Sequence, residues 1–161
     1  MMKRVIMIVA LAASFGVGFA FKGVWTETTK TKIKNETSYR YRRHFFKCQD
    51  PEKVRDWYKT HLGLDMSPYG SKFDWREDGD STKKGYTLWT PFPDKTKYFD
   101  PSGKDFMINY RVENIEALVE ELKKEGVTVL DKIEAYEYGK FVHIVDLEGN
   151  KIELFEPAAE K

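Results

Sequence analysis

The chain has 161 residues, 33% of them charged, and its formal net charge is only +1. This length fits one compact domain with a core of ordinary size. The balanced charge argues against a general electrostatic attraction to nucleic acid or to an anionic membrane. One cluster of arginines, Arg40, Arg42 and Arg43, alternates with tyrosines. We interpret it as an amphipathic strand or its lead-in rather than as a nucleic-acid patch, because no basic stripe recurs elsewhere.

The N-terminal segment differs in composition from the rest of the chain. A short positive start, Lys3-Arg4, precedes an apolar run from Val5 to Phe21, which is typical of a secretory signal peptide. Small residues near the end of the run predict cleavage after Ala20, so residues 1–20 would be removed and the protein would be periplasmic or secreted. The alternative is an uncleaved membrane anchor, since the run is near the lower limit of ~17 residues for a spanning helix.

A polar lead follows the apolar run. Residues 21–38 are rich in Thr and Lys without periodicity, and we interpret them as a flexible linker before a folded domain at 39–161. The single cysteine, Cys48, cannot form an internal disulfide, although an exported protein would permit one. Its apolar neighbours favour a buried structural thiol over a nucleophile.

Two helix signatures recur in the chain, 64 residues apart at their first residues, Asp50 and Asn114. Asp50 is a good N-cap with proline directly after it, and Gly63 ends the first helix. Asn114 and Gly126 bound the second helix in the same way. Apolar residues at i, i+3 and i+4 spacing predict one apolar face on each helix: Val54, Trp57, Tyr58, His61 and Leu62 in the first, and Ile115, Leu118, Val119 and Leu122 in the second.

Strand candidates surround both helices in the same order. One strand-like run precedes each helix and three follow it, so each half reads β-α-β-β-β. The predicted strands are 41–48, 64–69, 72–76 and 86–90 in module one (39–92), and 106–112, 127–130, 138–145 and 151–155 in module two (105–157), with a connection at 93–104. A unit that is built twice usually packs its copies around a shared surface, where a small molecule can bind.

With these elements in place, the chain resembles the vicinal oxygen chelate superfamily, which includes glyoxalase I, extradiol dioxygenases and the bleomycin and fosfomycin resistance proteins. The resemblance covers residues 39–157, and its motifs are fairly specific in order and spacing. They are the helix from Asp50-Pro51 to Gly63, the helix ending at Gly126, and the closing run Asp146…Gly149-Asn150…Glu153-Leu154…Pro157. The runs at 106–112 and 138–141 look like a bacterial glyoxalase-like branch. The resemblance implies an α+β fold, with a curved mixed sheet around one cleft and the helices outside.

The resemblance also implies a divalent metal, held by strand residues at matching positions of the two modules. Carried over to this sequence, those positions are Arg43, Thr87, Met107 and Glu153, of which only Glu153 is a competent ligand. A catalytic metal normally takes about three protein ligands, so we expect no cofactor. A register shift of one residue would bring His44 into the site, and the alternative metal set is Glu153, His44 and His143. Side-chain alternation, however, favours placing His44 on the helix side.

His143 and Glu153 form the main candidate site. His143 lies directly or diagonally across the predicted hairpin from Glu153, so the two side chains can share the cleft face. Such a pair can act as a general acid and base or take part in a metal site. The alternative is a cross-strand hydrogen bond that simply satisfies both buried groups.

Aromatic and arginine side chains are the candidate ligand contacts. Trp75, Trp89 and Phe155 fall on strands and could line an aromatic cavity, although a core would use the same residues. Tyr41, like Arg43, has the alternation expected for the cleft face. Arg43 and Arg111 occupy equivalent strands and could clamp a carboxylate or phosphate; the alternative is that they form ordinary salt bridges.

We therefore predict an exported glyoxalase-like protein that binds a small organic molecule in a cleft. One hypothesis is a lyase, isomerase or dioxygenase with Glu153 and His143 as catalytic residues. The other is a metal-free binding or sequestering protein of the bleomycin-resistance type. Neither nucleic acid nor, after cleavage, a membrane is an expected partner, and the protein would be a monomer or homodimer. The predicted substrate-binding residues are Arg43, Trp75, Trp89, Met107, Arg111 and Phe155.

Overall fold

The fold was analysed in a computed structural model that describes residues 40–77 and 79–159. The predicted signal peptide (1–20) and the predicted linker (21–38) both lie outside the described residues. Neither helix in the described part of the chain is long and apolar enough to span a membrane.

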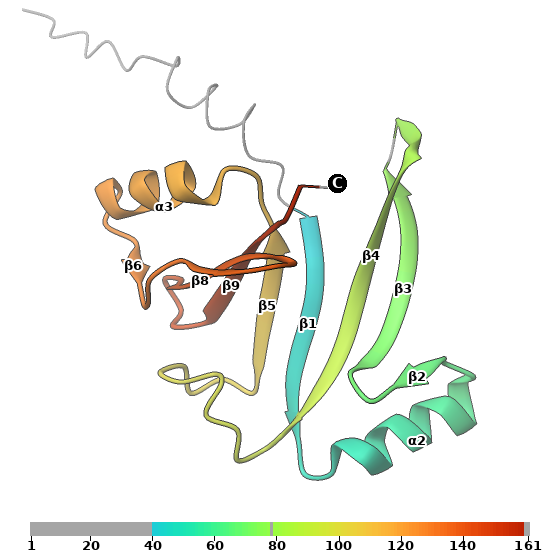
Figure 1. Ribbon diagram of the computed structural model, residues 1–161. Helices are drawn as coiled ribbons and strands as arrows, with labels where there is room; N and C mark the ends of the chain where they lie inside the picture. Colours follow the sequence, from blue (N-terminus) through green and yellow to red (C-terminus); the bar gives the residue numbers. More distant parts are fainter. Residues whose placement is uncertain (1–39, 78, 160–161) are drawn as a thin grey trace, which may run out of the picture.

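The described chain forms one mixed sheet with two helices (Figure 1). The spatial order of its strands is β2-β3-β4-β1-β5-β9-β8-β6, and β7 pairs with β8. Module one contains β1 (Arg40–Cys48), α2 (Pro51–Leu62), β2 (Met66–Ser67), β3 (Gly70–Glu77) and β4 (Asp80–Pro93). Module two contains β5 (Phe106–Arg111), α3 (Ile115–Lys124), β6 (Thr128–Val129), β7 (Glu134–Tyr136), β8 (Gly139–Val145) and β9 (Lys151–Pro157).

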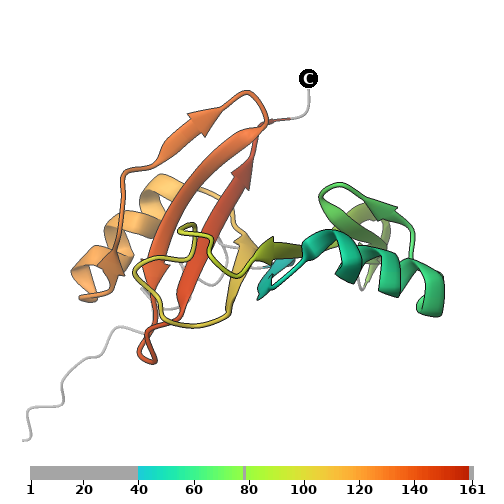
Figure 2. The ribbon, with the colours of Figure 1, turned by 90° about the horizontal axis from the view of Figure 1, so that it is seen from below.

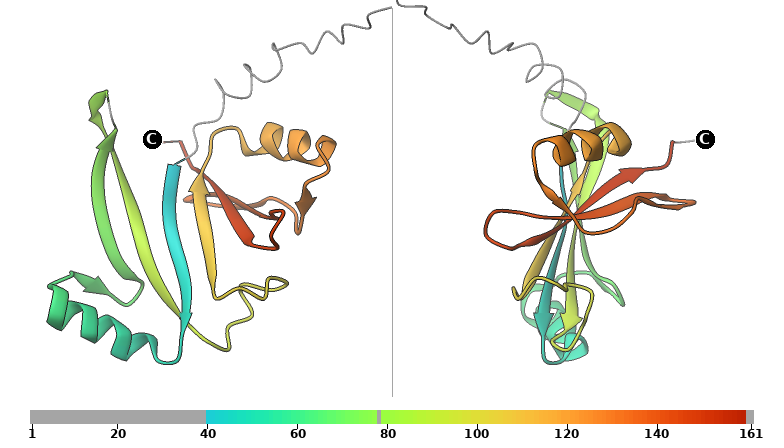
Figure 3. Two further views of the ribbon diagram at one scale, coloured as in Figure 1. Left: turned by 180° about the vertical axis from the view of Figure 1, so that it is seen from behind. Right: turned by 90° about the vertical axis from the view of Figure 1, so that its left-hand side faces the viewer.

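The strand order confirms the predicted duplication. In each module the first strand pairs in parallel with the last one, β1 with β4 and β5 with β9. The first strands of the two modules then pair with each other in antiparallel fashion. Seen from behind, β1 and β5 run side by side between the two halves (Figure 3). The small strand β7 is the one addition to the shared β-α-β-β-β pattern.

Both helices begin at the predicted residues because their caps satisfy the free amides of the first turn. The Asp50 side chain accepts a hydrogen bond from the amide of Lys53 at 3.1 Å, and Gly63 ends α2 with φ 66°. Asn114 caps α3, and the Glu156 carboxylate from β9 accepts from the amide of Ile115 at 3.0 Å. The N-terminus of α3 is thereby tied to the closing strand of its module.

The two helices differ in how much apolar surface they bury. Three residues of α3, Ile115, Leu118 and Val119, are buried against β8 and β9 in the main core. Helix α2 has no buried residue. Its predicted apolar face holds Trp57 and Leu62, which are 53% and 58% exposed. The sequence pattern therefore predicted the helix correctly but overstated its burial.

Strand lengths in module one also differ from the prediction. β4 begins at Asp80 rather than at 86, because its pairing with β3 continues through much of the segment between the two predicted strands, 72–76 and 86–90. β2 is reduced to Met66–Ser67 within the predicted 64–69 strand. The long β3–β4 hairpin forms one wall of the cleft described below.

The connection between the modules is a cover rather than a simple linker. Figure 2 shows it crossing β8 and β9. Ser102 Oγ donates to the carbonyl of Gly149 at 2.7 Å, and Lys151 Nζ donates to the carbonyl of Tyr98 at 2.7 Å. Phe99, fully buried, forms a second core cluster with Phe45 and Met107.

Candidate functional site

The register of the central strands separates two faces of the sheet. Glu153 lies opposite both Asn109 and His143, and Asn109 lies opposite Arg43. Paired residues on neighbouring strands project to the same side, so these four share what we call the cleft face. The helix face is the opposite one, and it carries the side chains that pack on α2 and α3.

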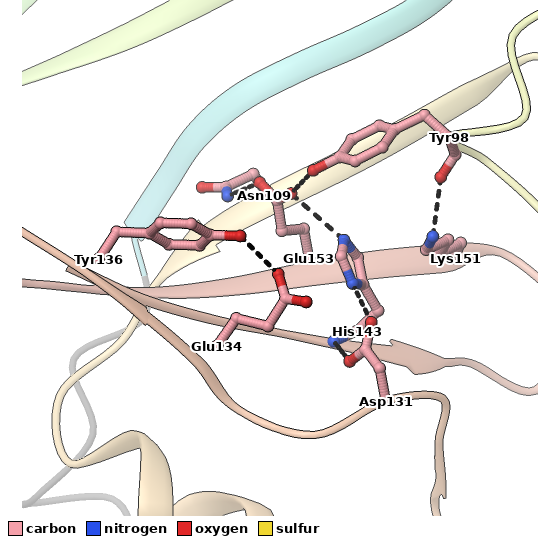
Figure 4. Close-up of polar contacts among 8 residues, drawn as sticks. All are labelled: Tyr98, Asn109, Asp131, Glu134, Tyr136, His143, Lys151 and Glu153. Atoms are coloured by element: carbon pink, nitrogen blue, oxygen red, sulfur yellow. Dashed lines mark hydrogen bonds and ion pairs between the residues drawn. The ribbon is translucent and has the colours of Figure 1, made fainter. Parts of the chain in front are cut away.

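Glu153 is the centre of a buried polar network on the cleft face (Figure 4). Its side chain is almost fully buried, with 2% of the residue exposed. The carboxylate accepts hydrogen bonds from the Tyr98 hydroxyl and from Asn109 Nδ2, and it lies 3.2 Å from His143 Nε2. A buried carboxylate needs such donors, because an unpaired charge away from water is very unfavourable. One of these donors, the Tyr98 hydroxyl, comes from the connection between the modules. The connection therefore covers Glu153.

His143 links Glu153 to a second carboxylate. His143 Nδ1 lies 2.6 Å from Asp131 Oδ2, and the His143 amide donates to Asp131 Oδ1 at 2.8 Å. The imidazole is 10% exposed, whereas the Asp131 side chain is 40% exposed. The arrangement is a carboxylate–imidazole–carboxylate chain that leads from the surface to the buried centre.

The network shifts the pKa values of its members in opposite directions. Burial raises the pKa of Glu153, but the donors His143, Tyr98 and Asn109 outweigh burial and hold that pKa below its ordinary value. Burial lowers the pKa of His143, yet its bonds to Glu153 and Asp131 raise it overall. Burial and the Glu153 carboxylate both raise the pKa of the Tyr98 hydroxyl. The favoured state at neutral pH is a charged Glu153 with Tyr98 protonated as its donor.

Three buried polar atoms on or beside the cleft face have no hydrogen-bond partner within the described residues. They are Arg43 Nε, Thr90 Oγ1 and Asn109 Oδ1. Burial, followed by the nearby charge of Arg42, lowers the pKa of Arg43, while Glu153 raises it. Arg43 on β1 and Glu153 on β9 lie on either side of Asn109 on β5, and within the described residues they form no ion pair within 4.0 Å.

The donor set does not fit a divalent metal. Among residues 40–77 and 79–159, no group of three His, Cys, Asp or Glu side chains is placed to hold one. Glu153 and His143 are committed to each other and to neighbouring groups, and the Arg43 guanidinium on the same face opposes a cation. Leu88, not Thr87, lies opposite Arg43, and a leucine offers no ligand. We therefore derive no chemistry from a metal.

Some predicted site residues lie away from the cleft. His44 pairs with Ile108 on the helix face and stacks on Phe46 and Phe106, with ring centroids 6.0 and 6.3 Å apart. It cannot join Glu153 and His143, so the alternative metal set does not assemble. Trp89 also faces the helix side, packed 4.5 Å from the ring of Tyr58 on α2.

Met107 lies on the cleft face but is completely buried beneath Phe99 of the connection. A ligand in the open cleft therefore does not reach it. The sequence pattern gave the correct face for Met107 and could not show what covers it.

A register shift in β1 changes which side chains face the cleft. The pairing of β1 with β5 slips between Tyr41 and Arg43, as in a β-bulge. Tyr41 therefore turns to the helix face, against its predicted position, and packs edge-on against Tyr110 at 6.2 Å. Arg42 turns to the cleft face, where its guanidinium lies 3.8 Å from the centroid of the Phe155 ring.

This bulge helps to form a pocket between the two modules. Its volume is about 340 Å³, and side chains from β1, β3, β4, β5 and β9 contribute to it. We call it the arginine–aromatic pocket. It is lined by Arg40, Arg42, Trp75, Gly85, Tyr86, Arg111, Tyr138, Phe155, Pro157 and Ala158.

The pocket contains three of the predicted ligand contacts and omits the others. Trp75, Arg111 and Phe155 line it, whereas Arg43 is a half-buried residue of the cleft face outside the pocket, with its Nε buried. Sequence reasoning missed Arg42 because strict alternation assigns it to the helix face. It also missed Tyr98, Asn109 and Asp131, and only Asn109 carried a signal, as a polar residue at cleft parity in an apolar strand.

Comparison with known proteins gives the fold a family. Residues 44–154 match the model of the Glyoxalase/Bleomycin resistance protein/Dioxygenase superfamily. No curated protein matches the sequence significantly. A structure of Streptomyces coelicolor methylmalonyl-CoA epimerase in complex with 2-nitronate-propionyl-CoA is similar with a TM-score of 0.54 and 16% identity, covering 74% of this chain and 98% of that one. A glyoxalase/bleomycin resistance protein/dioxygenase superfamily member from Vibrio splendidus 12B01 has a TM-score of 0.48 and 14% identity, with coverage of 74% and 99%.

Proposed function

Because the chain belongs to the glyoxalase/bleomycin resistance/dioxygenase superfamily, whose members bind small molecules, we propose that it binds a small organic molecule in the arginine–aromatic pocket. At 16% identity the epimerase shows only the fold, so its ligand is not transferred to this chain. The proposal rests on the pocket itself.

The observation that carries this proposal is the composition of the pocket walls. Aromatic side chains from both modules, among them Tyr86 and Phe155, stand beside arginines that can fix a polar group. Ligand sites typically combine apolar walls with a few convergent polar groups, in cavities of roughly 300–1,000 Å³. At about 340 Å³ this pocket is at the small end of that range, which suits a compact molecule.

The test is a thermal-shift screen of the purified protein against a library of neutral, cationic and anionic fragments. A ligand at about a hundred times its Kd should stabilise the fold by roughly 2.7 kcal/mol and raise the melting temperature accordingly. Tyr138 lines the pocket and is 63% exposed, so Tyr138→Ala should weaken the hits without harming the fold. Tyr69→Ala, at a residue that is 78% exposed and does not line the pocket, is the matched control.

If no fragment stabilises the protein, or if the hits bind Tyr138→Ala and the parent equally, the proposal fails. Equal weakening by Tyr69→Ala would point to a nonspecific effect and count against it too.

A second candidate function is acid–base catalysis at Glu153. The chain of Asp131, His143 and Glu153 favours it, because a buried charged carboxylate with a pKa held by an imidazole is a recurrent feature of active sites. Phe155, two residues along β9 and on the same face, lines the pocket. Access to Glu153, however, requires movement of Tyr98, so the geometry supports binding better than catalysis.

Catalysis can be tested on any carbonyl compound found in the screen. A general base next to the bound ligand should exchange the hydrogen on the carbon beside the carbonyl for deuterium in D₂O, which NMR detects directly. Glu153→Gln should abolish the exchange and leave binding intact. Exchange that continues in Glu153→Gln would eliminate this candidate, and so would its absence in the parent with a bound carbonyl ligand.

A further inference from the structure

The charge of the pocket narrows the class of ligand, and the following inference rests on the proposed binding function. We propose that the pocket selects a compact aromatic anion. Its carboxylate or phosphate group lies between Arg42 and Arg111, and its ring lies against the aromatic walls.

The first argument is the uncompensated positive charge. Arg40 is neutralised by Glu77, with its Nη2 2.6 Å from Oε1. Within the described residues, Arg42 and Arg111 form no ion pair, and no Asp or Glu lines the pocket. Because Glu77 already pairs with Arg40, the uncompensated positive charge of the pocket is that of Arg42 and Arg111.

The second argument is the position of Arg42. Its guanidinium carbon lies 3.8 Å from the centroid of the Phe155 ring and 5.8 Å from that of Tyr86. Attraction of a guanidinium to an aromatic face does not use its hydrogen-bond donors. The planar guanidinium still has N–H donors along its edge, and these match a carboxylate or phosphate in a bidentate arrangement.

The third argument is that the walls are fixed before any ligand arrives. A Cβ at Gly139 would overlap the Phe155 ring, and a Cβ at Gly85 would overlap the Trp75 indole. Both aromatic side chains therefore rest directly on backbone. Phe155 is further packed on Phe141, with ring centroids 4.7 Å apart, and Trp75 Nε1 donates to Thr87 Oγ1 at 3.0 Å. Fixed walls lower the entropy lost on binding.

These features together specify the ligand class. Two arginines without an ion pair in the described chain favour an anionic group that accepts several hydrogen bonds. Rigid aromatic walls favour a flat apolar body, and a volume of about 340 Å³ limits that body to a compact one. The pocket does not distinguish a carboxylate from a phosphate, because both groups accept hydrogen bonds from a guanidinium in the same way.

The experiment measures Kd by calorimetry for benzoate, phenyl phosphate and the neutral isostere benzamide on the purified full chain. At least one of the two anions should bind about tenfold more tightly than benzamide or better, and added salt should weaken it. Arg42→Met and Arg111→Met keep the aliphatic stem and remove the charge, so each should weaken the anion about tenfold or more. Arg55→Met, on α2 away from the pocket, is the matched control.

The ratio between the two anions separates carboxylate from phosphate recognition. Binding of benzamide as tight as that of the anions, or anion binding that survives both arginine substitutions, would overturn the inference and leave the proposed function standing. Failure of all three probes would also overturn the inference. The proposed function then falls as well only if the wider fragment screen finds no ligand that depends on Tyr138.

Discussion

At the scale of single residues, Glu153 is held by donors from three separate parts of the chain. Tyr98 comes from the connection, Asn109 from β5 and His143 from β8. All three donors face the same carboxylate. They are satisfied only if the group at this position accepts hydrogen bonds without donating any, as a charged carboxylate does. The Glu153 side chain thus joins β9 and its two neighbouring strands, β5 and β8, to the segment that links the modules.

Replacing the carboxylate should therefore destabilise the fold. In Glu153→Gln, the new NH₂ group must face at least one donor, because the three neighbours all donate to this position. We expect a loss of about 2–4 kcal/mol in the free energy of unfolding, measured by urea titration. Glu148→Gln, in the exposed turn before β9, should change the same quantity by less than about 0.5 kcal/mol. Equal stability of the two variants would contradict this account of the network.

The same network predicts a pH dependence of stability. Because the folded-state pKa of His143 is raised, its contribution is complete below the unfolded value of about 6.5 and is lost as the pH rises through the folded pKa. Because the folded-state pKa of Glu153 is lowered, its contribution is complete above about 4.3 and is lost as the pH falls. The pair should stabilise the fold most between roughly pH 4.5 and 6.5.

Melting temperatures measured from pH 5 to 9 can isolate the part due to His143. We expect the melting temperature of the parent to fall above about pH 7. In His143→Gln most of this fall should be absent. His61→Gln, an exposed histidine on α2, should keep the profile of the parent. An unchanged alkaline decline in His143→Gln would assign it to another group.

The donor set on the cleft face also predicts the response to chelators. With Arg43 and Leu88 on the cleft face in place of further ligands, the purified protein should carry no stoichiometric Zn, Ni, Fe or Mn. A chelator should leave its melting temperature unchanged. Elemental analysis that finds one equivalent of tightly held metal would refute this and make His143 the first ligand to examine.

At the scale of elements, local signals predicted the structure well where local physics decides it. Asp50 and Asn114 cap helices at the expected residues, and Gly63 ends α2 in a left-handed conformation. Caps and turns depend on a few neighbouring residues, so a single sequence contains them. The hairpin around Gly149 predicted that His143 lies directly or diagonally across from Glu153, and the structure has the direct pair.

The parts that sequence could not provide depend on non-local pairing. The slip between Tyr41 and Arg43 exchanges the faces of two neighbouring side chains, and nothing in the local pattern marks it. In the same way, the connection shows no periodicity that would place Tyr98 over Glu153. Such contacts arise from how distant strands meet, which is why Arg42 and Tyr98 were missed while Glu153 and Phe155 were found.

The unequal burial of the two helices predicts unequal sensitivity to mutation. Leu118 on α3 is 4% exposed in the main core, so Leu118→Ala should cost about 2–5 kcal/mol in the free energy of unfolding. Leu62 on α2 is 58% exposed, and Leu62→Ala should cost less than about 0.5 kcal/mol. Urea titration of both variants checks this, and a large loss in Leu62→Ala would mean that α2 is covered by something beyond this chain.

At the scale of the whole molecule, duplication produced one cleft from two unlike halves. Module two holds the main apolar core with α3 and the Glu153 network, whereas module one contributes a long hairpin and the arginines of β1. The arginine–aromatic pocket needs both modules, since Tyr86 comes from one and Phe155 from the other. Any ligand of this pocket should therefore stabilise the two halves together.

Export is a prediction about the whole chain, and it rests on residues outside the described part. Lys3-Arg4 followed by the apolar run to Phe21 should direct the protein out of the cytoplasm, and mass spectrometry should find a mature N-terminus near Phe21. Leu11→Arg places a charge in the apolar run, which is unfavourable by about 2.5–3.5 kcal/mol in the centre of an inserted helix. We expect this variant to remain full-length in the cytosol, and Leu11→Ile to behave as the parent. A full-length parent protein in the membrane fraction would favour the anchor, and a full-length parent in the cytosol would rule out export.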